Sequence, residues 1–226
     1  MPEWWTYRLS DFLLFSPRTY YRMFELYHGG IWPVHVIALA SGASIVALAR
    51  RVDIWAQRMV AGVLAAWWLW VGIAFHLNRY ATINWSAKYF AALFVIQGLL
   101  LAWCGIARGG LRLDFPRSTV HRVAAGLLVI TIIYPVFGRL AGREWNQVEV
   151  LGLTPDPTAI GTLALLALSV PKSPRPLFII PVLWCAIGAA TLWALGSPET
   201  WVVILSGLAG LVLAIRKSRE SPRYLA

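Results

Sequence analysis

Long stretches without Asp, Glu, Lys or Arg alternate with short polar connections along the chain. Because an α-helix rises about 1.5 Å per residue, roughly 20 consecutive apolar residues are needed to cross the hydrocarbon layer of a membrane. Seven stretches approach this length, at residues 31–49, 59–78, 89–107, 123–138, 158–170, 176–195 and 200–215. The pattern therefore predicts an all-α fold, a polytopic membrane helical bundle of about seven transmembrane helices.

The fifth stretch, 158–170, has only 13 residues, which span about 20 Å as a helix. Either the chain before it completes the crossing in another form, or the bilayer thins locally around a tilted helix. The preceding residues read TPDPT, in which Asp156 is suited to cap a helix that begins at Pro157. In the first case the helix start lies inside the protein, an arrangement with which transporters hold anions. Asp156 at that position favours a cation or a simple cap over an anion.

The basic residues alternate between the two ends of the predicted bundle. Thirteen Lys and Arg lie in the first, third and fifth connections and the C-terminal tail, against seven in the N-terminal segment and the other connections. Since short cytoplasmic loops are enriched in Lys and Arg, the N-terminus is predicted outside and the C-terminus in the cytoplasm. We expect three regions: an outer interfacial segment (1–30), a seven-span membrane domain (31–215) and a basic cytoplasmic tail (216–226).

Composition agrees with this class. The chain is 59% hydrophobic and 13% charged, with a mean hydropathy of +0.65, which excludes a water-soluble enzyme because soluble domains are about 45–50% apolar. A net charge of +10 is a common feature of nucleic-acid-binding proteins, but here the predicted cytoplasmic face carries all +10 and the outer face sums to zero. The charge thus reflects topology, and no nucleic-acid partner is expected. Cys104 and Cys185 both lie in apolar stretches, where we expect neither a disulfide nor a metal pair.

The segment before the first stretch is predicted to contain a helix. Ser16 and Pro17 form a typical helix start, and Gly29 and Gly30 are expected to end it. One side is apolar at helical spacing: Tyr20, Met23, Phe24 and Tyr27. This pattern favours a helix in the outer headgroup layer with that side turned toward the acyl chains. The alternative is a lid over an outward-facing site.

Three tryptophans, Trp67, Trp68 and Trp70, lie in mid-membrane on the second predicted span. An indole N–H needs a hydrogen-bond partner when it is buried. These side chains therefore either pack within the bundle or form the wall of a cavity.

Three blocks of the sequence carry a family resemblance: EWWTYRLSDFLLFSPRTYYRMFELY, AFHLNRYATINWSAKYF and GREWNQVEVLGLTPDPTAIGTLALL. They resemble an uncharacterised family of bacterial polytopic membrane proteins, domain of unknown function 6064, over most of the chain. The resemblance implies a multi-pass protein of the bacterial cytoplasmic (inner) membrane. It supplies no activity, cofactor or catalytic residue.

Histidines gather on the predicted outer side. His28, His35 and His76 fall in one leaflet, on the same side as Glu149 and Asp156. Imidazoles with a carboxylate can bind zinc or copper, and His35 with His76 could ligate a haem. No HxxxH or HExxH spacing accompanies them, so separate pairing with carboxylates or backbone groups is the alternative.

A second cluster lies at the mouth of the second span. His76, Arg79 and Tyr80 share one helix face at i, i+3 and i+4, and Asn84 and Lys88 follow. Such groups are either headgroup anchors or a site for an anionic ligand. The full candidate ligand-binding set is His76, Arg79, Tyr80, Asn84, Lys88, Glu149, Thr154 and Asp156.

Three function classes are consistent with these features. We favour a non-catalytic subunit or assembly factor of a membrane complex, embedded in the lipid bilayer. In that interpretation small residues pack against partner subunits: Gly98, Gly126, Gly188, Gly207 and Gly210. The alternative is a small transporter or ligand-binding protein with an outward-facing site. A third is an interfacial enzyme that uses His76 and a carboxylate as acid and base.

Overall fold

The computed structural model describes residues 13–49, 51, 53–109, 111–113, 118–170 and 175–219. The fold is all-α, as predicted, and these residues form eight α-helices. They are α1 (Pro17–Ile31), α2 (Val34–Ala49), α3 (Ile54–Trp70), α4 (Ala87–Leu101), α5 (Thr119–Leu140), α6 (Pro155–Leu168), α7 (Pro176–Ala194) and α8 (Thr200–Arg219). α3 continues into the π-helix η3 (Val71–Leu77) and α4 into the π-helix η5 (Ala102–Ala107).

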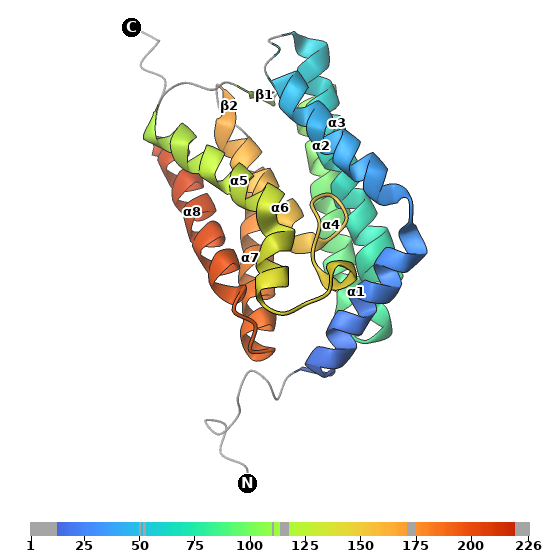
Figure 1. Cartoon of the computed structure of the whole chain (residues 1–226). Helices are drawn as coiled ribbons and strands as arrows, with labels where there is room; N and C mark the ends of the chain where they lie inside the picture. Colours follow the sequence, from blue (N-terminus) through green and yellow to red (C-terminus); the bar gives the residue numbers. More distant parts are fainter. Residues whose placement is uncertain are drawn as a thin grey trace, which may run out of the picture.

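Short elements occupy the connections. Two 3₁₀ turns, η4 (Tyr80–Thr82) and η6 (Trp145–Gln147), lie at the same end of the bundle as α1. At the other end, the two-residue strands β1 (Arg112–Leu113) and β2 (Ser169–Val170) pair antiparallel (Figure 1). This pairing joins the connection before α5 to the end of α6.

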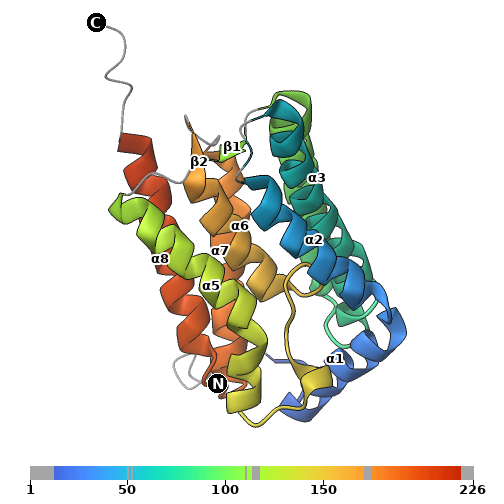
Figure 2. The same ribbon diagram turned by 45° about the horizontal axis from the view of Figure 1, so that its top comes forward.

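Helix α6 is the centre of the bundle. It contacts α5, α7 and α8, and Figure 2 shows it enclosed between these helices. All 14 of its residues are buried. Because protein rather than lipid surrounds this helix, its short length does not have to match the thickness of the bilayer. The predicted short helix at 158–170 is therefore present, as an enclosed core helix.

The start of α6 corrects one prediction. The helix begins at Pro155 and not at Pro157, and Thr154 rather than Asp156 occupies the N-cap position. Thr154 has the extended backbone that a cap residue needs, with φ of −128° and ψ of 158°. Asp156 lies in the first turn, where its carboxylate accepts hydrogen bonds from other helices. Both residues precede a proline and both types favour N-caps, so the local sequence alone does not separate them.

Several helices are long and apolar enough to cross a membrane, which indicates a multi-pass membrane protein. Among the described residues four meet this criterion, at Ile54–Thr82, Ala87–Ala107, Thr119–Leu140 and Pro176–Ala194. The pair α1 and α2, bent by 87°, would make a fifth as one broken span. Every one of the seven predicted stretches is largely helical. The count of seven crossings and the sidedness stay predictions.

Helix α1 begins as expected, with the Ser16 hydroxyl accepting a hydrogen bond from the amide of Thr19 at 3.2 Å. It runs to Ile31, past the predicted end at Gly29 and Gly30. These glycines have no positive φ, so the backbone continues through them.

The apolar side of α1 does not face acyl chains, which corrects a second prediction. Phe24 and Tyr27 are fully buried, and both rings contact Phe75 of η3, with centroids 5.1 and 5.3 Å apart. Tyr20 contacts Tyr80 in the same way. An aromatic face at helical spacing is satisfied by aromatic partners inside a protein as well as by lipid. α1 is therefore a packed part of the bundle end.

The three mid-span tryptophans are all satisfied. Their indole N–H groups donate to the Ser41 hydroxyl (Trp67, 3.0 Å), the Thr162 hydroxyl (Trp68, 2.8 Å) and the Tyr27 hydroxyl (Trp70, 2.9 Å). Trp67 also lines an apolar cavity of about 620 Å³ between α2, α5 and α6. Packing and a cavity wall, the two predicted roles, thus occur in the same group of side chains.

Candidate functional site: a buried acidic network at the start of helix α6

The loop between α5 and α6 turns back into the bundle, and its own hydroxyl groups hold it there. The Thr154 hydroxyl accepts from the Val150 amide at 2.8 Å and donates to the Val150 carbonyl at 3.0 Å. The Gly152 amide donates to the Thr158 hydroxyl at 2.9 Å. Gly152 has a φ of +80°, and a Cβ at this position would lie 2.7 Å from the Trp67 indole nitrogen. Only glycine fits both restrictions.

Two buried carboxyl groups meet at the first turn of α6. Glu149 and Asp156 are each 2% exposed. The Glu149 carboxylate accepts from the Asp156 amide at 3.1 Å, which satisfies one of the free N–H groups at the helix start. The negative charge of each carboxyl group disfavours that of the other, which favours a proton on one of them. Burial, followed by the neighbouring charge of Asp156, raises the pKa of Glu149 well above its ordinary value.

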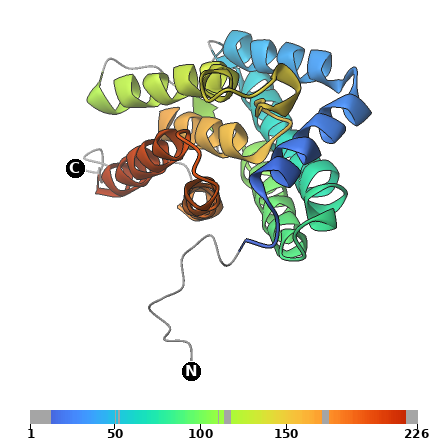
Figure 3. The ribbon, with the colours of Figure 1, turned by 60° about the horizontal axis from the view of Figure 1, so that its bottom comes forward.

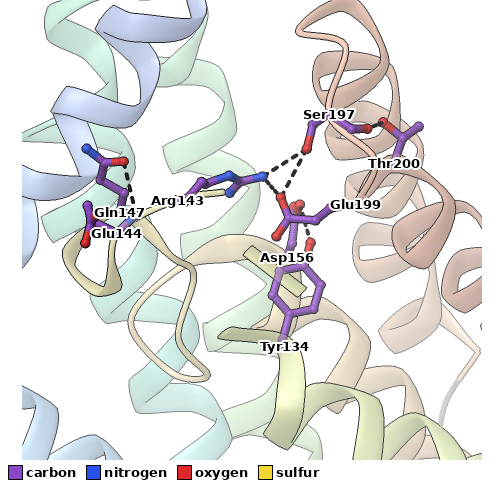
Figure 4. A network of polar contacts seen from close by, with 8 residues as sticks. All are labelled: Tyr134, Arg143, Glu144, Gln147, Asp156, Ser197, Glu199 and Thr200. Carbon is purple, nitrogen blue, oxygen red and sulfur yellow. Dashed lines mark hydrogen bonds and ion pairs between the residues drawn. The ribbon is translucent and has the colours of Figure 1, made fainter. Parts of the chain in front are cut away.

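Neighbouring helices supply donors to Asp156. The Trp184 indole of α7 donates to Oδ1 at 2.7 Å, and the Tyr134 hydroxyl of α5 donates to Oδ2 at 3.2 Å. Gly188 lies against the same carboxylate, since a Cβ there would come within 2.6 Å of Oδ1. α5, α6 and α7 therefore converge on one carboxylate, and Figure 4 shows the Tyr134 hydroxyl directed at it.

An ion pair closes the network on its other side. Arg143 and Glu199, 5% and 2% exposed, form a salt bridge (Figure 4). The Ser197 hydroxyl accepts from Arg143 at 2.9 Å and donates to Glu199 at 3.1 Å. The guanidinium also stacks on the Tyr21 ring of α1, 4.3 Å from its centroid. The second carboxylate oxygen of Glu199, Oε1, is buried without a hydrogen-bond partner.

The network holds more acid than base. Among the described residues it contains three buried carboxyl groups, those of Glu149, Asp156 and Glu199, and the single guanidinium of Arg143. Unpaired buried charges are costly, at several kcal/mol per ion after relaxation. Arg143 balances one carboxylate, so the remaining pair requires a proton or another cation.

The structure brings together two of the three predicted metal-binding histidines, His28 and His35, and leaves His76 apart. His28 Nδ1 lies 2.8 Å from His35 Nε2, and His28 Nε2 lies 2.9 Å from the Val148 carbonyl. The carbonyl can only accept, so Nε2 of His28 carries the hydrogen and Nδ1 of neutral His28 accepts from His35. His76 lies apart, and no group of three His, Cys, Asp or Glu in the described ranges could hold a metal. The predicted zinc, copper or haem site has no support in this geometry.

His76 is fully buried in an aromatic enclosure within η3. Its ring centroid lies 4.5 Å from that of Phe94 and 4.8 Å from that of Trp184, the donor to Asp156. Neither ring nitrogen has a hydrogen-bond partner. π-Helical turns often mark functional positions, and here the turn places an unsatisfied imidazole one side chain away from the acidic network.

The other residues of the predicted second-span cluster diverge. Tyr80 is buried beneath α1, whereas Arg79 lines a separate pocket. The Asn84 side chain accepts from the Ser86 amide at 3.1 Å, just before α4. Lys88 is exposed. Of the eight candidate ligand-binding residues, Glu149 and Asp156 are joined by a hydrogen bond, and the rings of His76 and Tyr80 pack with centroids 6.0 Å apart.

Five residues of the network were not predicted: Tyr134, Arg143, Trp184, Ser197 and Glu199. The sequence feature that pointed to such a network is the charge balance of the predicted outer side, which has seven acidic and seven basic residues. That balance favours paired charges. It does not identify the partners, because Arg143 and Glu199 lie in different connections.

An all-α bundle with several candidate spans and a buried acidic network defines a multi-pass membrane protein with a polar interior site at one end. Residues 18–223 match the model of a family of unknown function, DUF6064, so the chain belongs to this family. The resemblance stated from the three sequence blocks is thereby confirmed. No curated protein and no solved structure matches the chain.

Proposed function

We propose that this protein binds a proton or a small hard cation at the two carboxyl groups of Glu149 and Asp156. The observation that carries the proposal is the excess of buried carboxyl groups over the one guanidinium of Arg143. Carboxylate and hydroxyl oxygens are the ligands that hard cations prefer. When no metal ion is bound, a proton shared between Glu149 and Asp156 takes its place.

Binding is proposed rather than passage through the membrane. Hydroxyl groups continue from Thr154 through Thr158 to Thr162 along α6. Beyond Thr162 the helix is apolar as far as Leu168, and every residue of it is buried. Ion pathways need polar groups along their length. The predicted sidedness places the site toward the outer face in the bacterial inner membrane.

The packing of glycines supports this class over the subunit or assembly-factor interpretation. Four of the five glycines assigned to partner helices instead face side chains of this chain, since added Cβ atoms would lie 2.6–2.9 Å from them: Gly98 to Leu69, Gly188 to Asp156, Gly207 to Cys185 and Gly210 to Leu163. Gly126 alone of the five has open space. A partner complex remains an outcome that co-purification would reveal. The enzyme interpretation lacks an acid–base pair, because His76 has no hydrogen-bond partner.

Proton release on cation binding tests the proposal. We expect that adding Na⁺, K⁺, Mg²⁺ or Ca²⁺ to the purified protein in weakly buffered detergent releases protons with at least one of these ions. The same ion should bind more weakly at lower pH, because protons compete for the site. Asp156→Asn should abolish both effects. The matched control Glu144→Gln, at a side chain that is 73% exposed, should change neither. If no ion binds and the network holds no exchangeable proton between pH 5 and 9, the proposal is wrong.

A further inference from the structure

A second polar pocket lies at the same end of the bundle, apart from the acidic network. Figure 3 looks toward this end and shows α1 lying beside the segment that joins α3 to α4. The pocket between them has a volume of about 790 Å³, which is within the usual range for small-ligand sites. Its polar lining consists of Arg18, Thr19, Tyr21, Arg22 and Glu25 on α1, Arg79 and Thr82 after η3, and Gln147 of η6.

The charge of this pocket is opposite to that of the network. Glu25 forms a salt bridge with Arg22. The hydrogen bond to that guanidinium lowers the pKa of the Glu25 carboxyl group below its ordinary value. Arg18 and Arg79 have no ion-pair partner in the part of the chain that the structure describes. Two uncompensated guanidinium groups from separate elements therefore face one hollow.

The guanidinium of Arg79 packs against Gly30 near the end of α1. A Cβ at Gly30 would lie 2.9 Å from Nη2 of Arg79, so the guanidinium lies directly against the end of α1. Arg79 is half-buried, and its position is more restricted than that of a freely extended surface arginine. The close approach of Arg79 gives a reason for glycine at position 30, which the formation of a helix alone does not require.

We propose that this pocket binds a phosphate group, and that its source is the headgroup of an anionic phospholipid. Guanidinium groups form paired hydrogen bonds with phosphate oxygens. The Gln147 amide supplies a further donor at the rim, whereas the Thr82 hydroxyl already donates to the Arg79 carbonyl at 2.7 Å. Leu26 lines the same pocket and is 50% exposed, and a lipid would cover this apolar side chain while its phosphate meets the arginines. The assignment does not depend on the acidic network.

Binding is tested with the full-length protein in an uncharged detergent after removal of bound lipid. Phosphatidylglycerol and inorganic phosphate are titrated separately, and the thermal unfolding midpoint is followed. We expect Arg18→Gln and Arg79→Gln each to raise the phosphatidylglycerol concentration for half-maximal stabilisation about tenfold. Lys88→Gln is the matched control, because Lys88 is an exposed base at the same end but outside the pocket. It should leave that concentration unchanged.

The outcomes separate the two phosphate sources. Arginine-dependent stabilisation by phosphatidylglycerol alone supports a lipid headgroup. The same dependence with inorganic phosphate assigns the pocket to a soluble phosphate compound and overturns the lipid source. Stabilisation that Lys88→Gln weakens equally, or no stabilisation by either probe, overturns the pocket itself. Gly30→Ala provides a second variant, since it crowds Arg79 and keeps the charge, and it should weaken binding in the same direction.

Discussion

The indole nitrogen of Trp184 lies 2.7 Å from Oδ1 of Asp156, and this hydrogen bond connects the middle of α7 to the first turn of α6. The same indole packs edge-to-face against His76, with ring centroids 4.8 Å apart. One side chain thus separates a buried carboxyl group from a buried imidazole. Because both lie in the interior, changes to Trp184 should affect the fold and the acidic network together.

Replacement of Trp184 by Phe tests this connection. Phe keeps an aromatic ring among Phe90, Phe94 and His76 but removes the donor to Asp156. We expect a loss of about 1–3 kcal/mol in the free energy of unfolding, since a buried acceptor loses its partner. Thermal or denaturant unfolding in detergent measures it. Trp55→Phe, at a side chain that is 70% exposed, is the control and should change stability little. Equal effects of the two substitutions would contradict the assigned role of the hydrogen bond.

The raised pKa of Glu149 predicts a pH dependence of stability. In the unfolded chain this carboxyl group ionises near its ordinary value of 4.5, whereas in the folded protein it keeps its proton to higher pH. The folded state therefore binds more protons above pH 4.5, and stability falls as the pH rises until the folded group also ionises. The charged groups that face Glu149 are Asp156 and Arg143. Their ionisation contributes to the same pH range.

Glu149→Gln provides the comparison for this effect. Gln keeps an oxygen that can accept from the Asp156 amide but cannot ionise. The decline of the unfolding midpoint between pH 5 and 8 should become shallower than in the wild type. Glu144→Gln, at an exposed position, should reproduce the wild-type slope. A Glu149→Gln slope as steep as the wild type would show that another group titrates.

Two glycines on different helices give a matched test of packing around Asp156. A Cβ at Gly188 would lie 2.6 Å from Oδ1 of Asp156, whereas a Cβ at Gly126 meets nothing within 4 Å. Gly188→Ala should therefore cost about 1–3 kcal/mol of unfolding free energy through overpacking. Gly126→Ala should be neutral or stabilising by up to about 1 kcal/mol, because alanine favours a helix. Both values come from unfolding in the same detergent, and a reversed order would refute the packing described here.

Sequence patterns predicted the helices well because apolar runs are a local property. They failed where tertiary contacts determine which partner a side chain meets. The face of α1 formed by Tyr20, Phe24 and Tyr27 has the same spacing whether it meets lipid or Phe75, so its burial was not predictable. Asp156 was identified as a polar residue at a helix start inside the protein. Its donors come from α5 and α7, and nothing in the chain near residue 156 names them.

The last prediction concerns the salt bridge between Arg143 and Glu199. It distinguishes the interaction energy of the pair from the cost of burying one of the two charges without its partner. Arg143→Met should destabilise the protein by about 3–5 kcal/mol, because it leaves Glu199 buried without a cation. Adding Glu199→Gln removes that unpaired charge, so the double variant should recover much of the loss. A double-mutant cycle with both single variants measures the coupling directly. Since Arg143 also stacks on Tyr21, recovery should be incomplete. Purely additive effects would mean that the two side chains do not interact.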